Sequence, residues 1–433
     1  MQYHIRRTLI ELLSADAWKA RIVFWCGAVL VGVLATLFAW GTEEANALFL
    51  GSAARWPFMP LLLTPVGLVV VVWLTRRFVP GAKGSGIPQA IAALSMREHE
   101  SRSLLLSFRI ALAKIGLCLL GMLCGASIGR EGPTVHVGAA VMFSLGRFAR
   151  FPHHYMDRGL ILAGGAAGIA AAFNTPLAGI LFAIEEMARS FEERTSGTLL
   201  TAVFLAGITA VALQGNYVYF GTSSASLAPG QILLPIFLCG ILGGALGGLF
   251  SQTLIVISRR VAGLSGHHPY LLAAGCGLVI ALVGIYTHGA TFGTGYHEAR
   301  RIVTGEGELG AAYPFLKMLA TWASYISGIP GGIFAPSLAT GAGVGNSLAA
   351  LLPAYPAGAI VILGMVGYFT GVVRTPITAF VIVMEMTDNN SLLLPLMATA
   401  FIAHATSHIV CPVPIYQALA EAFLPRRAQP SEG

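Results

Sequence analysis

Charged residues are scarce in this sequence: only 10% of its 433 residues are Asp, Glu, Lys or Arg, whereas 56% are hydrophobic. The mean hydropathy is +0.75. Apolar runs of about 20 residues, the length that one bilayer crossing needs, recur along the chain, for example over 22–39, 61–74 and 236–255. The composition therefore leaves no room for a sizeable soluble domain and indicates an all-α membrane protein that crosses the bilayer several times.

Paired cysteines are also lacking. The six cysteines lie scattered in or beside apolar runs, and no two of them have CxxC spacing. This excludes the common zinc and thiol redox motifs and predicts that the cysteines are packing residues without disulfides. His136, His404 and His408 form no metal-like group, so we expect neither a metal nor a cofactor.

A cleavable signal peptide is not expected. The first 20 residues carry Arg6 and Arg7, but their apolar core is short and no small-residue cleavage site follows. We interpret residues 1–20 as an amphipathic helix on the membrane surface. Other basic residues cluster near segment ends and contribute to a net charge of +7. Because basic loops stay in the cytoplasm, we expect both termini to be cytoplasmic and the number of crossings to be even.

The chain contains an internal duplication. GSGIPQA at 84–90 reappears as GTGYHEA at 293–299, and GASIGREGPTVHVG at 125–138 aligns with GIPGGIFAPSLATG at 328–341. Further matches in the same order are Lys114/Lys317, Ser144/Ser347, Gly164/Gly364, Thr175/Thr375, Pro176/Pro376 and Glu185/Glu385. Such repeats are typical of secondary transporters and related channels, whose site lies between the repeats near the bilayer midplane. We predict transmembrane repeats over 21–217 and 231–412, a linker over 218–230, and a C-terminal helix with a short basic tail over 413–433.

Several matched blocks are too short or too rich in glycine and proline to cross the membrane alone, notably 87–94, 134–145 and 334–348. Broken helices leave N-termini inside the protein, where free N–H groups and the helix dipole bind anions. GSGIP, GREGP and GGIFAP each place a proline, namely Pro88, Pro133 or Pro336, where a first helical turn is expected. Ser85 either caps its helix or presents its hydroxyl to a ligand.

These three motifs, in this order, resemble the signature of the CLC family of chloride channels and chloride/proton antiporters. The resemblance extends to ILFAIEEM at 180–187 and to Tyr416, and so spans roughly 61–424. It implies two inverted-topology repeats of broken and tilted helices, a homodimer, and a multi-pass protein of the cell membrane. Many eukaryotic members carry cytoplasmic regulatory domains after the membrane part. This sequence ends shortly after Tyr416, which favours a prokaryotic inner or plasma membrane protein.

The resemblance also implies a set of chloride ligands. They are the hydroxyls of Ser85 and Tyr416, the amides of Ile333 and Phe334, and, at an outer site, the amides from Arg130 to Gly132. Supporting roles fall to Lys114, Gly84, Gly86 and Pro88. Ser85 points to chloride, since nitrate-preferring relatives carry proline at that position. The residues alone leave alternatives open: Tyr416 as an interfacial aromatic, Lys114 as a helix brace rather than a source of positive potential, and Arg130 as a brace or part of the outer mouth.

Glu131 matches the gating glutamate of the family. The duplication singles it out independently, because it stands where the second repeat has Phe334. A carboxylate at a helix N-terminus mimics chloride, and once protonated it loses that attraction and swings away. Burial favours its neutral form and helix ends favour its charged form, so its proton affinity depends on whether chloride is bound. A simple ion pair with Arg130 is the alternative.

ILFAIEEM offers two adjacent glutamates. Glu185 has a counterpart in Glu385, whereas Glu186 has none, and neighbouring helical residues point about 100° apart. We interpret Glu185 as architectural and Glu186 as the internal proton acceptor, in agreement with the family pattern.

A second carboxylate of this kind favours a secondary active chloride/proton antiporter over a passive voltage- or pH-gated chloride channel. The expected partners are chloride ions, protons and the lipid bilayer, without nucleic acid. A hypothesis of another class is an intramembrane serine protease, with Ser85 as nucleophile and His404 or His408 as base. That hypothesis leaves the duplication unexplained, and we therefore expect no enzymatic activity.

Overall fold

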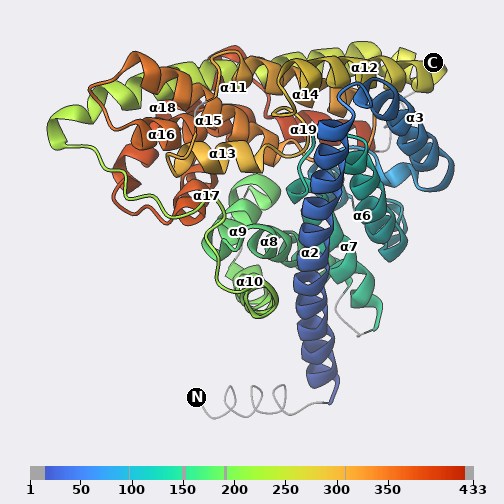
Figure 1. Cartoon of the computed structure of the whole chain (residues 1–433). Helices are drawn as coiled ribbons and strands as arrows, with labels where there is room; N and C mark the ends of the chain where they lie inside the picture. Colours follow the sequence, from blue (N-terminus) through green and yellow to red (C-terminus); the bar gives the residue numbers. More distant parts are fainter. Residues whose placement is uncertain (1–14, 97, 149–152, 190–192, 308, 425–433) are drawn as a thin grey trace, which may run out of the picture.

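The computed structural model describes residues 15–96, 98–148, 153–189, 193–307 and 309–424 (Figure 1). The surface helix predicted over 1–20 lies largely outside these residues, and the basic tail of the segment predicted over 413–433 lies outside them as well. The described part of the chain is helical, and its only bridges between extended segments are two isolated ones. Seven of the described helices are long and apolar enough to cross a membrane.

The first half of the chain forms the helices α2 (Ala15–Arg55), α3 (Pro60–Phe78), α4 (Ile87–Ser95), α5 (His99–Ser103), α6 (Phe108–Leu123), α7 (Glu131–Leu145), α8 (His153–Phe173), α9 (Pro176–Phe182) and α10 (Glu193–Gln214). Short helical turns are η1 (Pro80–Ala82), η2 (Gly146–Phe148) and η3 (Ala183–Ala188).

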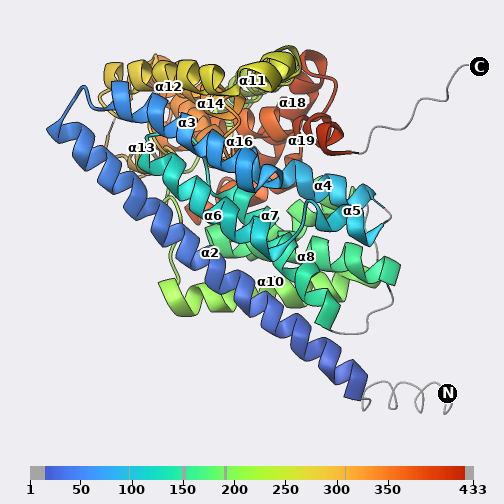
Figure 2. The same ribbon diagram turned by 90° about the vertical axis from the view of Figure 1, so that its right-hand side faces the viewer.

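After the turn η4 (Pro229–Gln231), the second half forms α11 (Leu233–His267), α12 (Pro269–Tyr286), α13 (Tyr296–Val303), α14 (Tyr313–Ile326), α15 (Phe334–Leu351), α16 (Ala357–Val373), α17 (Pro376–Thr387), α18 (Leu393–Val410) and α19 (Ile415–Ala420), followed by η5 (Glu421–Phe423). In both ribbon views α14, α16 and α18 lie above α7, α8 and α10, whereas α3 from the first half lies beside α12 from the second half (Figures 1 and 2).

The short helices predicted at the matched blocks are present. α4 has 9 residues and α7 has 15, both fewer than the roughly 20 that a crossing needs. α15 has 18 residues, and its first turn is buried. The structure therefore places helix N-termini inside the protein, as the glycine and proline pattern predicts.

Repeat-matched glycines allow the helices of each repeat to approach closely. A Cβ atom on Gly138 of α7 would collide with the carbonyl of Gly164 on α8, and one on Gly341 of α15 would lie 2.9 Å from the carbonyl oxygen of Gly364 on α16. Small residues at such contacts are typical of packing inside membranes. All six cysteines are described, and each is free in this structure.

Candidate functional site

Two loops, one from each repeat, are hydrogen-bonded to each other at the centre of the site. The amide of Gly129 donates to the carbonyl of Gly332 at 2.7 Å, and the amide of Gly332 donates to that of Gly129 at 2.8 Å. These two glycines are repeat equivalents, so the exchange is reciprocal. Gly84 is joined to the same second loop, since its amide donates to Ile329 and its carbonyl accepts from Gly331, both at 3.2 Å. The loops thus bring together the N-termini of α4, α7 and α15.

Glu131 is the first residue of α7 and is fully buried. Its Oε2 accepts a hydrogen bond from the amide of Ala335, in the first turn of α15, at 3.4 Å. Its Oε1 has no hydrogen-bond partner among the described residues. The carboxylate therefore lies where an anion would bind, between the N-termini of α7 and α15.

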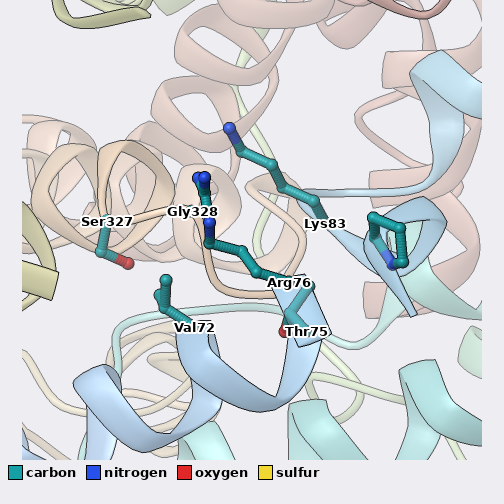
Figure 3. A pocket seen from close by; sticks show the side chains of 7 residues that line it. Val72, Thr75, Arg76, Lys83, Ser327 and Gly328 are labelled. Carbon is teal, nitrogen blue, oxygen red and sulfur yellow. The ribbon is translucent and has the colours of Figure 1, made fainter. Parts of the chain in front are cut away.

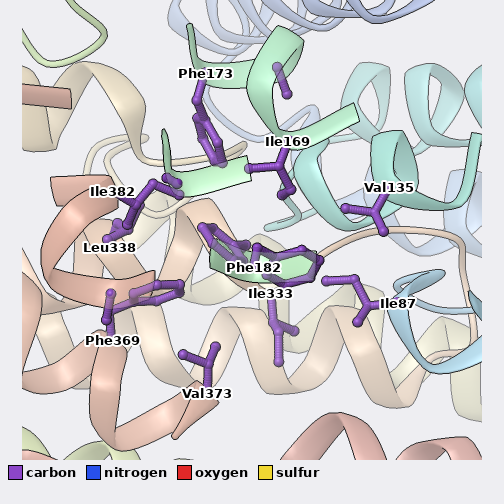
Figure 4. Packing of buried hydrophobic residues seen from close by; sticks show 14 of the residues in the cluster. Ile87, Val135, Ile169, Phe173, Phe182, Ile333, Leu338, Phe369, Val373 and Ile382 are labelled. Carbon is purple, nitrogen blue, oxygen red and sulfur yellow. The ribbon is translucent and has the colours of Figure 1, made fainter. Parts of the chain in front are cut away.

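Ile333 and Phe334 lie at the N-terminus of α15, the helix end at which the Glu131 carboxylate also lies. Ile333 is the N-cap residue, no side chain caps the helix, and no carbonyl in the described chain accepts from either amide. Aromatic side chains close the space behind this helix end: the ring of Phe334 packs against that of Phe369 at 4.3 Å and that of Phe173 at 5.4 Å. Figure 4 shows Ile87 and Val135 approaching the same cluster from α4 and α7. Two buried amides at this helix end are thus available to donate to an anion, beside apolar side chains.

Ser85 and Tyr416 are both buried, and neither hydroxyl has a hydrogen-bond partner in the described chain. Ser85 does not cap α4, because the N-cap residue is Gly86 and no side chain caps that helix. The N-cap alternative is therefore wrong. Tyr416 lies on α19, which packs on α4, within electrostatic range of Glu131 and Glu186. Its complete burial rules out an interfacial aromatic. Buried hydroxyls rarely stay unpaired, so both are available to a ligand.

Glycines are required where the backbone meets the ligand groups. Gly86 has φ +103°, and a Cβ atom there would lie 2.5 Å from Cβ of His136. A Cβ atom on Gly132 would collide with the hydroxyl oxygen of Ser85. Pro88 occupies the buried first turn of α4, as the motif predicts.

The family resemblance implies that the Ser85 hydroxyl binds chloride, and on that basis we expect Gly132→Ala to weaken chloride binding by about tenfold or more, because the new methyl group displaces this hydroxyl. Gly116→Ala in α6 is the matched control, since a Cβ atom there meets nothing within 4 Å. Isothermal titration of both purified variants with chloride checks the prediction. Equal affinities in the two variants would contradict it.

Glu185 and Glu186 have opposite environments, although they are adjacent in the π-helical turn η3. Glu185 accepts from the amides of Ile377 at 3.1 Å and Thr378 at 2.7 Å, at the start of α17. Glu385 in turn accepts from the amides of Leu177 and Ala178 at the start of α9. Each of these matched glutamates caps a helix of the other repeat, which confirms the architectural interpretation of Glu185.

Glu186 is fully buried, and neither of its carboxylate oxygens has a hydrogen-bond partner in the described chain. Its repeat counterpart is the buried Met386. The charged groups that interact electrostatically with Glu186 are Arg189, Glu185 and Arg374. A buried carboxyl without partners is costly to keep for packing alone and is a candidate for proton transfer.

The basic residues around the site have structural partners. The Lys114 ammonium donates to the carbonyl of Gly84 at 3.1 Å, and Lys317 donates to that of Gly293 at 2.8 Å, so the matched lysines brace matched loops. Lys114 also adjoins Gly86, where a Cβ atom would lie 2.8 Å from its nitrogen. The brace alternative therefore holds, and the Lys114 nitrogen also lies beside the site.

Arg130 directs its side chain away from Glu131. It donates to the carbonyl of Ala39 at 2.7 Å and pairs with Glu43 at 3.1 Å, both on α2. It also lines a small cavity with Tyr219 and Tyr296. The alternative of a simple Arg130–Glu131 ion pair is therefore wrong, whereas both the brace and the mouth interpretations of Arg130 fit.

Sequence reasoning missed Arg102. This buried guanidinium donates to the carbonyls of Ala93 at 3.1 Å and Met96 at 2.7 Å, and it pairs with Asp157 at 3.0 Å. It thereby satisfies the C-terminal carbonyls of α4. The polar surroundings of Arg102 in the sequence resemble a solvated loop, so no pattern identified it.

A family model described as "Voltage gated chloride channel" matches residues 66–408. Among solved structures, a slow cyanobacterial Cl⁻/H⁺ antiporter is 25% identical with a TM-score of 0.83, over 95% of this chain and 99% of that one. A CLC-type fluoride/proton antiporter is 23% identical with a TM-score of 0.78, over 94% and 98% of the two chains. A eukaryotic CLC transporter is 22% identical with a TM-score of 0.74, over 92% and 74%.

Proposed function

Because the chain belongs to the voltage-gated chloride channel (CLC) family, and is therefore a membrane anion transporter with two inverted repeats and not an enzyme, we propose that it exchanges chloride for protons. The observation that carries the proposal is the position of Glu131, whose carboxylate accepts from the amide of Ala335 at a helix N-terminus. The similarity to a structure described as a Cl⁻/H⁺ antiporter supports exchange.

In the proposed cycle, chloride and the Glu131 carboxylate compete for the same amides. Chloride displaces the charged side chain from the helix end, and the displaced carboxylate then takes up a proton. Loss of the proton restores a carboxylate that competes with chloride again. The unpartnered hydroxyls of Ser85 and Tyr416, and the amides of Ile333 and Phe334, hold chloride through partial charges. Such ligands bind an anion without trapping it.

Glu186 supplies the second proton position in this proposal. Neither of its carboxyl oxygens has a hydrogen-bond partner in the described chain, whereas Glu185 is held by the amides at the start of α17. The family resemblance also implies a homodimer in the cell membrane, and the basic residues near both ends of the sequence favour a cytoplasmic position for both termini.

Reconstituted vesicles test exchange against passive conduction. With a chloride gradient and no proton gradient, we expect the protein to drive protons uphill across the membrane, because a shared site links the two ions. Chloride efflux and external pH are recorded together, with a proton ionophore as control. Chloride movement without proton movement would identify a channel and contradict exchange.

A further inference from the structure

The two hydroxyls of the candidate site are carried by loops with different support. The loop before Ser85 is hydrogen-bonded to the second repeat through Gly84, and a cavity lies between this loop and α3 (Figure 3). Tyr416 instead follows the segment 411–414, whose sequence is CPVP. Its two prolines have no amide hydrogen to donate. The position of Tyr416 therefore depends on what binds the carbonyls of this segment.

Arg374 binds two of these carbonyls. It ends α16 in the left-handed conformation, with φ 61°. Its Nη1 donates to the carbonyl of Cys411 at 2.9 Å and to that of Pro412 at 2.6 Å. Hydrogen bonds from a charged donor are stronger than those between neutral groups. Arg374 thus joins the junction of α16 and α17 to the segment that leads to Tyr416.

The same guanidinium makes a third contact, with an imidazole. Its Nη2 lies 2.7 Å from Nδ1 of His408, in the last turn of α18. A guanidinium has donors and no acceptor, so Nδ1 of His408 must accept and the ring carries its proton on Nε2. A second proton, added at Nδ1, would remove the acceptor and place two cations against each other. The contact therefore requires a neutral His408.

The surroundings of this contact contain other titratable groups. Those that interact electrostatically with Arg374, or with His404 one turn before His408, are His408 itself, Cys411, Arg189, Glu185 and Glu186. α11 meets the last turn of α18 through Gly248, which carries no side chain. No carboxylate in the described chain forms an ion pair with Arg374 or His408. A proton on His408 would therefore add a second positive charge that no paired carboxylate balances.

The first repeat makes the matching junction without charge. Asn174, the counterpart of Arg374, follows α8 and is also left-handed, with φ 57°. Its amide donates to the carbonyl of Tyr217 at 2.9 Å and to the side chain of Asn216 at 3.0 Å. The fold therefore needs only a neutral amide at this position. The guanidinium and the imidazole are additions to the repeat whose last helix leads to Tyr416.

We propose that Arg374 is a positioning residue for Tyr416 and that His408 makes this positioning depend on pH. While His408 is neutral, the guanidinium is held by three acceptors and fixes the segment 411–414. Protonation of His408 displaces the guanidinium, because the two cations repel each other. Histidine changes its charge between about pH 5 and about pH 8, so acid weakens the support of Tyr416. The inference rests on the proposed role of Tyr416 in binding chloride.

Chloride binding to purified Glu131→Gln tests this inference, because that variant lacks the carboxylate whose protonation favours chloride. We expect chloride to bind about fivefold more weakly at about pH 5 than at about pH 8, opposite in sign to the effect of Glu131 in the wild type. His408→Asn, added to this background, should abolish the difference, since an amide oxygen accepts from Arg374 and does not titrate. Titration calorimetry measures the affinities.

His404→Asn in the same background is the matched control, since it makes the same change at a ring whose Nδ1 has no hydrogen-bond partner in the described chain. It should keep the pH dependence. Arg374→Asn, which copies the first repeat, should bind chloride weakly at both pH values, and the His408 variant decides if this one does not fold.

Equal affinities of Glu131→Gln at the two pH values would overturn the proposal. A pH dependence that persists in His408→Asn, or one that is lost equally in His404→Asn, would also overturn it. So would undiminished chloride binding by Arg374→Asn. Exchange itself is tested by proton movement in the vesicle assay, so failure of the proposed function and failure of this inference give different results.

Discussion

Glu131→Gln is expected to abolish uphill proton transport while chloride still crosses the membrane. Glutamine keeps the size of the side chain and can still meet the amide of Ala335, but it has no charge with which to compete with chloride and takes up no proton. Chloride flux should stay within about tenfold of wild type, because the amides and hydroxyls that hold chloride are unchanged. Vesicle assays that follow both ions measure the two fluxes.

Glu43→Gln is the control for this variant. Glu43 is an acidic residue that pairs with Arg130, but its side chain is largely exposed. We expect it to retain coupling. Uphill proton transport by Glu131→Gln would remove Glu131 from the mechanism.

Glu186→Gln is expected to have the second large effect, again a loss of proton transport with chloride flux preserved. Its carboxyl group is the only part of Glu186 that the substitution alters, and no hydrogen bond within the described chain is lost, since neither oxygen has a partner. Protein stability should therefore change little. The same two-ion vesicle assay, together with thermal unfolding in detergent, checks both expectations.

Glu185→Gln is a closely matched control, because it makes the same chemical change one residue earlier. It weakens a charge-assisted cap on α17, so we expect lower stability, by about 1–2 kcal/mol, with coupling retained. The reverse pattern, coupling lost in Glu185→Gln and kept in Glu186→Gln, would show that the two roles are assigned to the wrong residues.

Because the chain is duplicated, much of the candidate site could be predicted from the sequence. Each matched glycine and proline marks a place where the backbone turns, so the short helices and their buried N-termini followed from the pattern. The comparison of copies also separated Glu185 from Glu186, since only the first has a partner in the other repeat.

Contacts between distant side chains did not follow from the pattern. Arg130 has Glu131 as its sequence neighbour, yet its ion pair is with Glu43 on α2. The serine of GSGIP sits where a capping residue is common, yet the hydroxyl of Ser85 lies against Gly132 instead. In each case the direction of the side chain depends on contacts with another helix, α2 for Arg130 and α7 for Ser85. The spacing of residues along the chain does not predict such contacts.

The central claim is that chloride and the Glu131 carboxylate occupy one site in turn. Its most direct test is the number of protons taken up when chloride binds, measured by calorimetric titration in buffers of different ionisation enthalpy. We predict net proton uptake by the wild type, because the displaced carboxylate is protonated, and by reciprocity tighter chloride binding as the pH falls. Glu131→Gln should bind chloride without this uptake. Chloride binding to the wild type with no proton uptake, or uptake that persists in Glu131→Gln, would contradict the claim.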